Sequence, residues 1–340
     1  VILLEIRKYS DVCVQDFLTA FRPGYLTINI NSYNARGSFI DSGSRVLKPD
    51  MDSVALLRKN NLTGLFWMVV YTLAMSGMHG SVRHVSESLH PFEIAFFRLV
   101  FGLLAILPFF FRHGFSILRT SRLPMHALRG IINAGCMMGF FYALSIGPLA
   151  RVTALGFSAT LFAIVLAVFI FGEKVGLKRW VAIIVGFAGT LVIVRPGFAD
   201  IGIESIITLG AAFGWAVCMI IIKDLGKTES AATITTYMSL TMAPIVLIPA
   251  LFVWTAPSLY DYAWLIVIGL LGGLGQFAMA NALKLGEAQV VLPIEFSRLI
   301  WISIIAFFAF GEIPGIYIWI GGGMIMASTT YNTIRESKRK

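Results

Sequence analysis

The chain of 340 residues is 57% hydrophobic and only 13% charged, with a net charge of +9. Because soluble domains carry about 25% charged residues, this composition excludes an ordinary water-soluble domain and indicates a membrane protein. The three cysteines, Cys13, Cys136 and Cys218, lack the spacing of a metal site or a disulfide framework, so neither a metal nor another cofactor is expected.

Residues 1–50 differ from the rest of the chain in their mixed polar composition, and they contain no apolar segment of a signal peptide. They are followed by Met51 and the basic pair Arg58-Lys59. We expect Met51 to be the natural start and residues 1–50 to be a disordered extension added by an over-extended gene prediction. A genuine cytoplasmic tail is the alternative.

Ten apolar segments follow, each near the length of about 20 residues that a helix needs to cross a bilayer. The connections between them are short and leave no room for a soluble domain. The predicted fold is therefore an all-α integral membrane protein with ten transmembrane helices. These helices are expected at about 62–82, 92–111, 128–145, 152–171, 178–194, 203–222, 233–254, 263–283, 289–310 and 314–333.

Lysine and arginine are enriched in the cytoplasmic loops of membrane proteins. If the N-terminus is cytoplasmic, sixteen of these residues after position 50 lie on that side, and three, Arg83, Arg151 and Arg195, lie in loops on the other. This distribution predicts a multi-pass protein of the cytoplasmic (inner) membrane with both termini in the cytoplasm and a basic tail at 334–340. The positive charge then needs no nucleic-acid partner, and the lipid bilayer is the expected partner.

The chain also repeats itself at a constant offset of 139 residues, without a gap. Two halves of five helices each are expected at 60–195 and 203–333, and because five is odd, the second half enters the membrane in the opposite sense. Inverted repeats are typical of alternating-access carriers, which bind their solute near the midplane between the halves. The matching segments are 142–144 with 281–283, Gly147 with Gly286, Phe157-Ser158 with Phe296-Ser297, 171–173 with 310–312, Gly176 with Gly315 and Trp180 with Trp319.

Small residues recur within three of the predicted helices as GxxxG pairs, a pattern that lets helices approach closely in membranes. The pairs are Gly135 with Gly139, Gly210 with Gly214, and Gly269 with Gly273. They predict tight helix packing and carry no information about a solute.

Over residues 60–335 the sequence resembles the drug/metabolite transporter superfamily, specifically its ten-helix branch made of two EamA-type repeats. The segments that carry the resemblance are Glu93 to Arg98, Phe141 to Leu144, and the two Phe-Gly-Glu endings at 171–173 and 310–312. The resemblance implies a carrier of small metabolites, a class that includes amino acids, nucleotide-like compounds, vitamins and drugs.

Within that superfamily, the runs 89–98, 120–122 and 126–130 are similar to carriers of S-adenosylmethionine. Those carriers place an arginine before a glutamate in the ninth helix, whereas here Glu295 precedes Arg298. The resemblance implies uptake of S-adenosylmethionine or a related zwitterionic or nucleotide-like solute.

Charged residues inside membrane helices are costly and often mark a solute pathway. Glu295 and Arg298 lie three residues apart on one helical face, just after Pro293, which removes a backbone hydrogen bond and favours a kink. We expect Arg298 to bind an anionic group of the solute and Glu295 to bind a cationic group or a coupling proton. The alternative is a structural pair that neutralises itself.

The remaining candidates for solute binding are ionisable, amide or aromatic side chains within or beside the predicted helices. Each has a plainer alternative: a structural partner for Arg98, the membrane interface for Glu93 and His79, and a helix–helix hydrogen bond for the others. The candidates are Arg98, Glu93, Tyr142, Trp215, Asn281 and His79.

These features favour a secondary active transporter that acts as a monomer or a homodimer. The alternatives within that class are an exporter of amino acids or drugs and a riboflavin-type vitamin uptake carrier. A membrane-embedded enzyme is the alternative outside it, but the five histidines, at 79, 84, 90, 113 and 126, are scattered over loops and helix ends rather than grouped as a catalytic site requires.

Overall fold

The computed structural model describes residues 39–40, 46–47, 51–113, 120–171, 176–196, 202–229, 231–286 and 288–337. The chain divides into two compact units, Val1–Leu56 and Leu57–Lys340. In the first unit, β1 (Phe39–Ile40) pairs with β2 (Val46–Leu47) in antiparallel register, a short strand pair that the sequence did not predict. The remainder of 1–50, and with it the predicted disordered extension, lies outside the described residues.

The predicted ten membrane-spanning helices are confirmed as ten helical segments, two of which are interrupted. Seven described helices are long and apolar enough to cross a membrane, and Thr236–Phe252 is a shorter apolar stretch. The first five segments are α2 (Met51–Val85), α3 (Pro91–His113), α4 (Leu123–Ile146), α5 (Leu149–Gly156) with α6 (Ser158–Phe171), and α7 (Leu177–Val194). The second five are α8 (Ile203–Leu225), α9 (Ala231–Phe252), α10 (Leu259–Leu285), α11 (Ala288–Val291) with η3 (Leu292–Phe296) and α12 (Ser297–Phe310), and α13 (Ile316–Ser337).

The interruptions lie at equivalent positions of the two halves. α6 begins at Ser158 and α12 at Ser297, which are 139 residues apart. In the second half Pro293 has no backbone N–H to continue the α-helical ladder, and the predicted kink is a 3₁₀ turn, η3. In the first half the segment expected as one continuous helix is broken after Gly156, a residue with low helix propensity.

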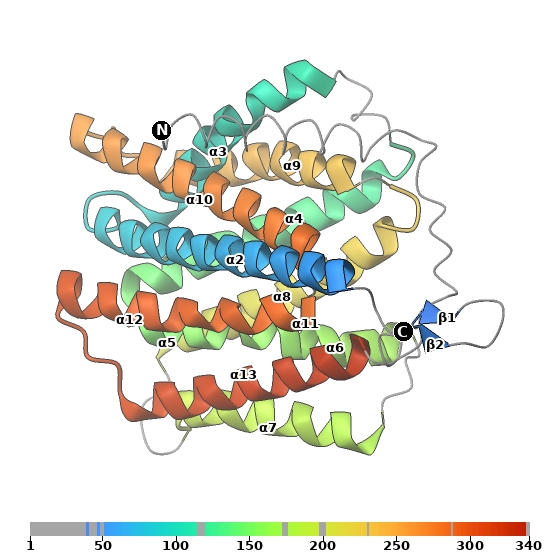
Figure 1. Ribbon diagram of the computed structural model, residues 1–340. Coiled ribbons are helices and arrows are strands. Elements are labelled where there is room, and N and C mark those ends of the chain that lie inside the picture. Colours follow the sequence, from blue (N-terminus) through green and yellow to red (C-terminus); the bar gives the residue numbers. More distant parts are fainter. Residues whose placement is uncertain are drawn as a thin grey trace, which may run out of the picture. The chain divides into compact units, whose positions relative to one another are not determined.

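The contacts between helices follow the same symmetry. α4 packs against α8, and in the equivalent pair Gly64 of α2 closely approaches Ala282 of α10 and Gly286, the residue after α10. α4 also packs against α9, as α10 does against α3, while α3 with α9, α5 with α12 and α7 with α13 each join equivalent helices of the two halves. The neighbouring helices α7 and α13 are visible in Figure 1. The protein is thus a membrane bundle of two inverted five-helix repeats.

Two close helix approaches depend on glycine. A Cβ atom added at Gly64 would lie 2.7 Å from the Cα of Gly286, and one at Gly321 would lie 2.4 Å from the carbonyl oxygen of Gly189. Neither pair belongs to the predicted GxxxG motifs. In those motifs Gly214 and Gly269 do meet a neighbouring helix closely, whereas Gly135 and Gly210 have open space around them.

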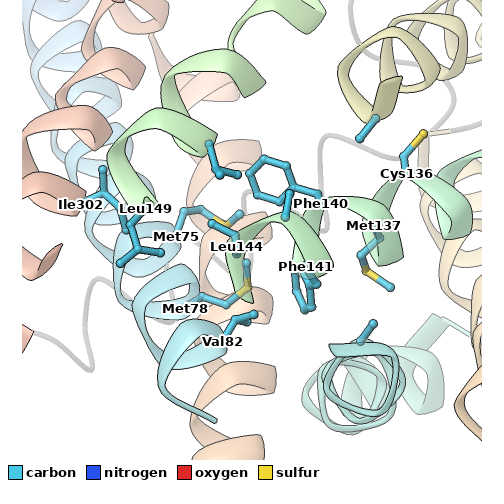
Figure 2. Packing of buried hydrophobic residues seen from close by; sticks show 14 of the residues in the cluster. Met75, Met78, Val82, Cys136, Met137, Phe140, Phe141, Leu144, Leu149 and Ile302 are labelled. Carbon is cyan, nitrogen blue, oxygen red and sulfur yellow. The ribbon is translucent and has the colours of Figure 1, made fainter. Parts of the chain in front are cut away.

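The largest buried cluster of the bundle draws residues from helices of both halves, and α2 and α4 contribute the most. Met75, Met78 and Val82 of α2 lie beside Leu144 and Phe141 of α4 (Figure 2). Residues three or four positions apart share one face of a helix, so this apolar stripe sets the rotation of α2 about its axis. Polar residues of α2 on and beside that stripe are therefore turned into the bundle as well.

Candidate solute-binding site

The interruption before α12 places a charged pair inside the bundle. Glu295 lies in η3 and Arg298 in the first turn of α12, and their Oε1 and Nη2 atoms are 3.8 Å apart. The Tyr71 hydroxyl of α2 lies between them, donating to Glu295 Oε1 at 3.5 Å and accepting from Arg298 Nη1 at 3.5 Å. The two side chains are only 25% and 11% exposed. The predicted pair is therefore joined by a tyrosine of the other half.

Two further contacts hold α2 against the interrupted segment. Ser297 Oγ donates to Thr72 Oγ1 at 3.1 Å, and Ser76 Oγ donates to the carbonyl oxygen of Arg298 at 3.3 Å. Both contacts lie at the N-terminal turn of α12, where the chain leaves the 3₁₀ turn η3. Hydroxyl groups of one half thus support the interruption in the other.

The interruption in the first half meets the same cluster. The ring of Phe157, between α5 and α6, lies 4.7 Å from the guanidinium carbon of Arg298. This distance falls within the range of a cation–π interaction. Arg298 therefore contacts Glu295, Tyr71 and Phe157 together.

Arg98 of α3 has a different environment. Its Nε donates to Met78 Sδ at 3.3 Å and its Nη1 to Met137 Sδ at 3.1 Å, and its guanidinium carbon is 6.0 Å from the Phe141 ring. Within the described ranges no carboxylate lies within ion-pair distance of Arg98. Thioether sulfur is a weak acceptor, so the charge of Arg98 is poorly compensated.

His79 of α2 is buried, with 3% of its surface exposed, rather than at a membrane interface. Its ring centroid is 5.2 Å from that of Phe140, and the charges of Arg98 and Arg298 both act on it. Its Nδ1 atom has no hydrogen-bond partner in the part of the chain that the structure describes. His79 therefore belongs to the same central cluster as the two arginines.

Trp215 of α8 borders this cluster through Phe140, with ring centroids 5.0 Å apart. Its indole Nε1 donates to Asn133 Oδ1 at 3.0 Å, and Asn133 Nδ2 contacts Met242 Sδ at 3.1 Å. The indole N–H of Trp215 is thus used in a helix–helix hydrogen bond, and its ring packs against Phe140 at the border of the central cluster.

The other three candidates make contacts away from the cluster. Glu93 Oε1 accepts from the backbone N–H of Thr255 at 3.0 Å and from its hydroxyl at 3.1 Å. The Tyr142 ring lies 6.4 Å from that of His90, and Asn281 Nδ2 donates to the Phe277 carbonyl of its own helix. Glu93 thus joins α3 to the connection before α10.

One end of the bundle, which we call the Glu312 end, is closed by contacts between the halves. Glu312 Oε1 lies 3.7 Å from Arg83 Nη2, and its Oε2 accepts from the backbone N–H of Leu149 at 2.9 Å. Arg151 pairs with Glu204 at 3.2 Å. Glu173, the repeat equivalent of Glu312, lies outside the described residues.

Except for His79, the residues of α2 that border the cluster were absent from the sequence-based candidates, although a signal was present. Tyr71, Met75, Met78 and His79 recur at spacings of three and four, as on one face of a helix. Tyrosine and methionine are ordinary core residues, so the pattern indicates a buried face and does not distinguish a site. In the described segments, no three His, Cys, Asp or Glu side chains gather as a metal site would require.

The sequence model of the EamA-like transporter family matches residues 62–195 and, a second time, residues 202–334. The chain belongs to the EamA-like transporter family. The two matches correspond to the two five-helix repeats, and the membership implied by the motifs at 93–98 and 310–312 is confirmed. The protein is accordingly a membrane transporter of small molecules.

The chain aligns with individual relatives over most of its own length and most of theirs. The chain is 33% identical to an S-adenosylmethionine uptake transporter of Rickettsia felis over 82% of this chain and 95% of that protein. It is 29% identical to a riboflavin transporter of Vibrio cholerae over 83% and 97%, respectively. A solved crystal structure with 16% identity has the same fold, with a TM-score of 0.56 over 83% of this chain and 99% of the other.

Proposed function

We propose that this EamA-family member is a secondary carrier of the cytoplasmic membrane that moves S-adenosylmethionine, or a closely related zwitterionic solute, by alternating access. The observation that carries the proposal is the cluster of Glu295, Arg298 and Tyr71 at the interruption of the ninth span, together with the buried Arg98 of α3. Both charge signs are present there, as a zwitterion requires. The chemical nature of the solute is further supported by the S-adenosylmethionine transporters among the relatives.

The geometry supports a role for Glu295 toward the cationic part of the solute. Its Oε1 shares contacts with Tyr71 and Arg298, and in S-adenosylmethionine the sulfonium and ammonium groups are the available cations. Arg298 lies 3.8 Å from Glu295 and holds this carboxylate in place beside Tyr71. If a proton is coupled to transport, Glu295 carries it, because arginine does not deprotonate in proteins.

The halves would then move about this cluster. The interruptions of α5–α6 and η3–α12 meet at the centre, and the Glu312 end is held closed by Arg83 and Arg151 in this conformation. By the distribution of lysine and arginine, the Glu312 end faces away from the cytoplasm and both termini are cytoplasmic. Rocking one half against the other opens each side in turn.

Two other transport functions and one enzymatic function compete with this proposal. Riboflavin carries no charge that needs both Glu295 and Arg298, and an exporter would transport in the opposite direction. A membrane-embedded enzyme would convert its substrate, whereas a carrier releases it unchanged. We therefore propose that the chain is a transporter rather than an enzyme. We also propose that it acts as a monomer or a homodimer.

The test is uptake of radiolabelled S-adenosylmethionine by proteoliposomes that contain the purified full chain. We expect saturable uptake that unlabelled S-adenosylmethionine inhibits and that excess riboflavin or neutral amino acids leave unchanged, with the label recovered as intact solute. Saturable uptake of riboflavin without uptake of S-adenosylmethionine would replace this proposal with the vitamin carrier. A chemically altered label would indicate an enzyme.

A further inference from the structure

The central cluster contains an imbalance of charge. Among the described residues it holds two guanidinium groups, Arg98 and Arg298, and a single carboxylate, Glu295. A buried or membrane-embedded cation is costly unless an anion accompanies it. One positive charge of the cluster thus lacks a counter-ion within the protein.

Within the described segments, only one of the two arginines has a carboxylate that compensates its positive charge. Arg298 is paired with Glu295 at 3.8 Å, and it also contacts Tyr71 and the Phe157 ring. Arg98 contacts the thioether sulfurs of Met78 and Met137, and its guanidinium carbon lies 6.0 Å from the centroid of the Phe141 ring. The uncompensated charge is therefore that of Arg98.

A second observation points in the same direction. Two buried ring or guanidine nitrogens of the cluster, His79 Nδ1 and Arg298 Nε, have no hydrogen-bond partner in the described part of the chain. A guanidinium nitrogen can only donate, and a neutral imidazole presents a donor on one of its two nitrogens. The cluster therefore has hydrogen-bonding capacity that a bound solute would fill, and the charge without a counter-ion is that of Arg98.

The surroundings of Arg98 allow it to change partners. Met78 and Met137 are flexible, polarisable side chains that repack at little cost, and both line the buried cluster drawn in Figure 2. On the opposite side, a Cβ atom added at Gly272 of α10 would lie 3.2 Å from Arg98 Nε and 3.3 Å from Met78 Sδ. The glycine of the second half therefore leaves space around the guanidinium of the first.

We propose that Arg98, with His79 beside it, anchors the carboxylate of the transported solute, while Arg298 serves to hold Glu295 in place. This inference rests on the proposed transport of a zwitterion and refines it, because it assigns the anionic group to α3 rather than to α12. A planar guanidinium binds a carboxylate through two parallel hydrogen bonds. The carboxylate then becomes a determinant of specificity.

The experiment compares S-adenosylmethionine with its decarboxylated form as competitors of labelled S-adenosylmethionine uptake in proteoliposomes. The parent chain is expected to prefer the carboxylated compound by roughly 10- to 100-fold, the range of a charge-assisted hydrogen-bonded contact. Arg98→Lys and Arg298→Lys form a matched pair, because each keeps the charge and loses the planar fork. The preference should fall by about 10-fold in Arg98→Lys and persist in Arg298→Lys.

Arg98→Met supplies a second variant, since methionine suits the contacts with Met78 and Met137. It should bind both compounds with the affinity of the decarboxylated one, and that retained affinity also shows that the variant is folded. Full preference in both Arg98 variants, or its loss in Arg298→Lys alone, would overturn the assignment. A parent chain that takes up no S-adenosylmethionine would overturn the proposed function itself, which is a different result from uptake without selectivity.

Discussion

Phe157 and Phe296 occupy the same position in the two halves, and their rings face each other with centroids 4.7 Å apart. Each lies directly before the helix that resumes after an interruption, α6 or α12. The pair therefore marks the point at which the two inverted halves meet. The same Phe157 ring also lies against Arg298, so the symmetric contact and the charged cluster share a side chain.

Replacing this ring should affect transport without unfolding the protein. Phe157→Leu keeps much of the apolar volume but removes the cation–π contact, which contributes about 0.5–2 kcal/mol. We expect uptake at low solute concentration to fall several-fold, with an unchanged elution profile in size-exclusion chromatography. Phe162→Leu is the control, because Phe162 of the same span packs on Phe187 at 5.2 Å and touches no charged residue of the cluster. An equal loss in both variants would refute a specific role for Phe157.

Substitutions of the charged pair Glu295 and Arg298 distinguish a functional role from a structural one. If Glu295 and Arg298 bind solute or organise its site, Glu295→Gln and Arg298→Lys should each lower uptake by about 10-fold or more while both proteins insert into the membrane normally. Initial uptake rates and the amount of protein in the membrane are measured together. Parental rates in both variants would show that the pair only braces the bundle.

Glu312 should control how easily reagents and solute enter the bundle from the Glu312 end. Ala150 lines a hollow of about 90 Å³ together with Arg151 and Glu312, and it is 2% exposed. In a background without native cysteines, Ala150→Cys should react slowly with a membrane-impermeant maleimide. Adding Glu312→Gln removes the anion that holds Arg83 and the Leu149 amide, so labelling should accelerate several-fold.

The control for that experiment is Asp224→Asn, which removes an ion pair with Arg122 at the opposite end of α8. Its effect on labelling of the introduced cysteine should be small. Acceleration by Asp224→Asn alone would show that the Glu312 contacts do not govern this access.

The close approach of α7 and α13 predicts a large difference between two neighbouring glycines. In Gly321→Ala the new Cβ would collide with the carbonyl oxygen of Gly189, a backbone atom that cannot move alone, and overpacking of this kind costs about 1–3 kcal/mol. Gly323→Ala meets no atom within 4 Å. Thermal unfolding in detergent should therefore show a lower midpoint for Gly321→Ala and a parental one for Gly323→Ala. Equal midpoints would contradict the helix packing described here.

The proposed orientation is tested at the C-terminus. An alkaline phosphatase fused after Lys340 folds only outside the cytoplasm, and the basic residues near this end predict that it stays on the cytoplasmic side. We expect no phosphatase activity, with a fluorescent protein at the same position as the positive control. Phosphatase activity at Lys340 would reverse the assignment of both ends of the bundle.

The sequence by itself determined the membrane class, the ten segments and the inverted halves. Hydropathy is a local property of about 20 residues, and the offset of 139 residues is visible in any alignment of the chain with itself. It also determined the proximity of Glu295 and Arg298, because residues three apart remain neighbours on one helical turn. Pro293 likewise predicted the interruption before α12, because proline has no backbone N–H to donate.

Only the tertiary structure decided which side chains complete the site. Tyr71 reaches Glu295 across 224 positions of sequence, and Arg98 lies against Met78 and Met137, whereas Glu93 is committed to Thr255. These partners depend on the rotation and depth of each helix, which are set by packing against neighbouring helices of both halves. Hydropathy and spacing within one helix carry no information about either quantity, so the partners of a membrane-embedded charge emerge only when the bundle is assembled.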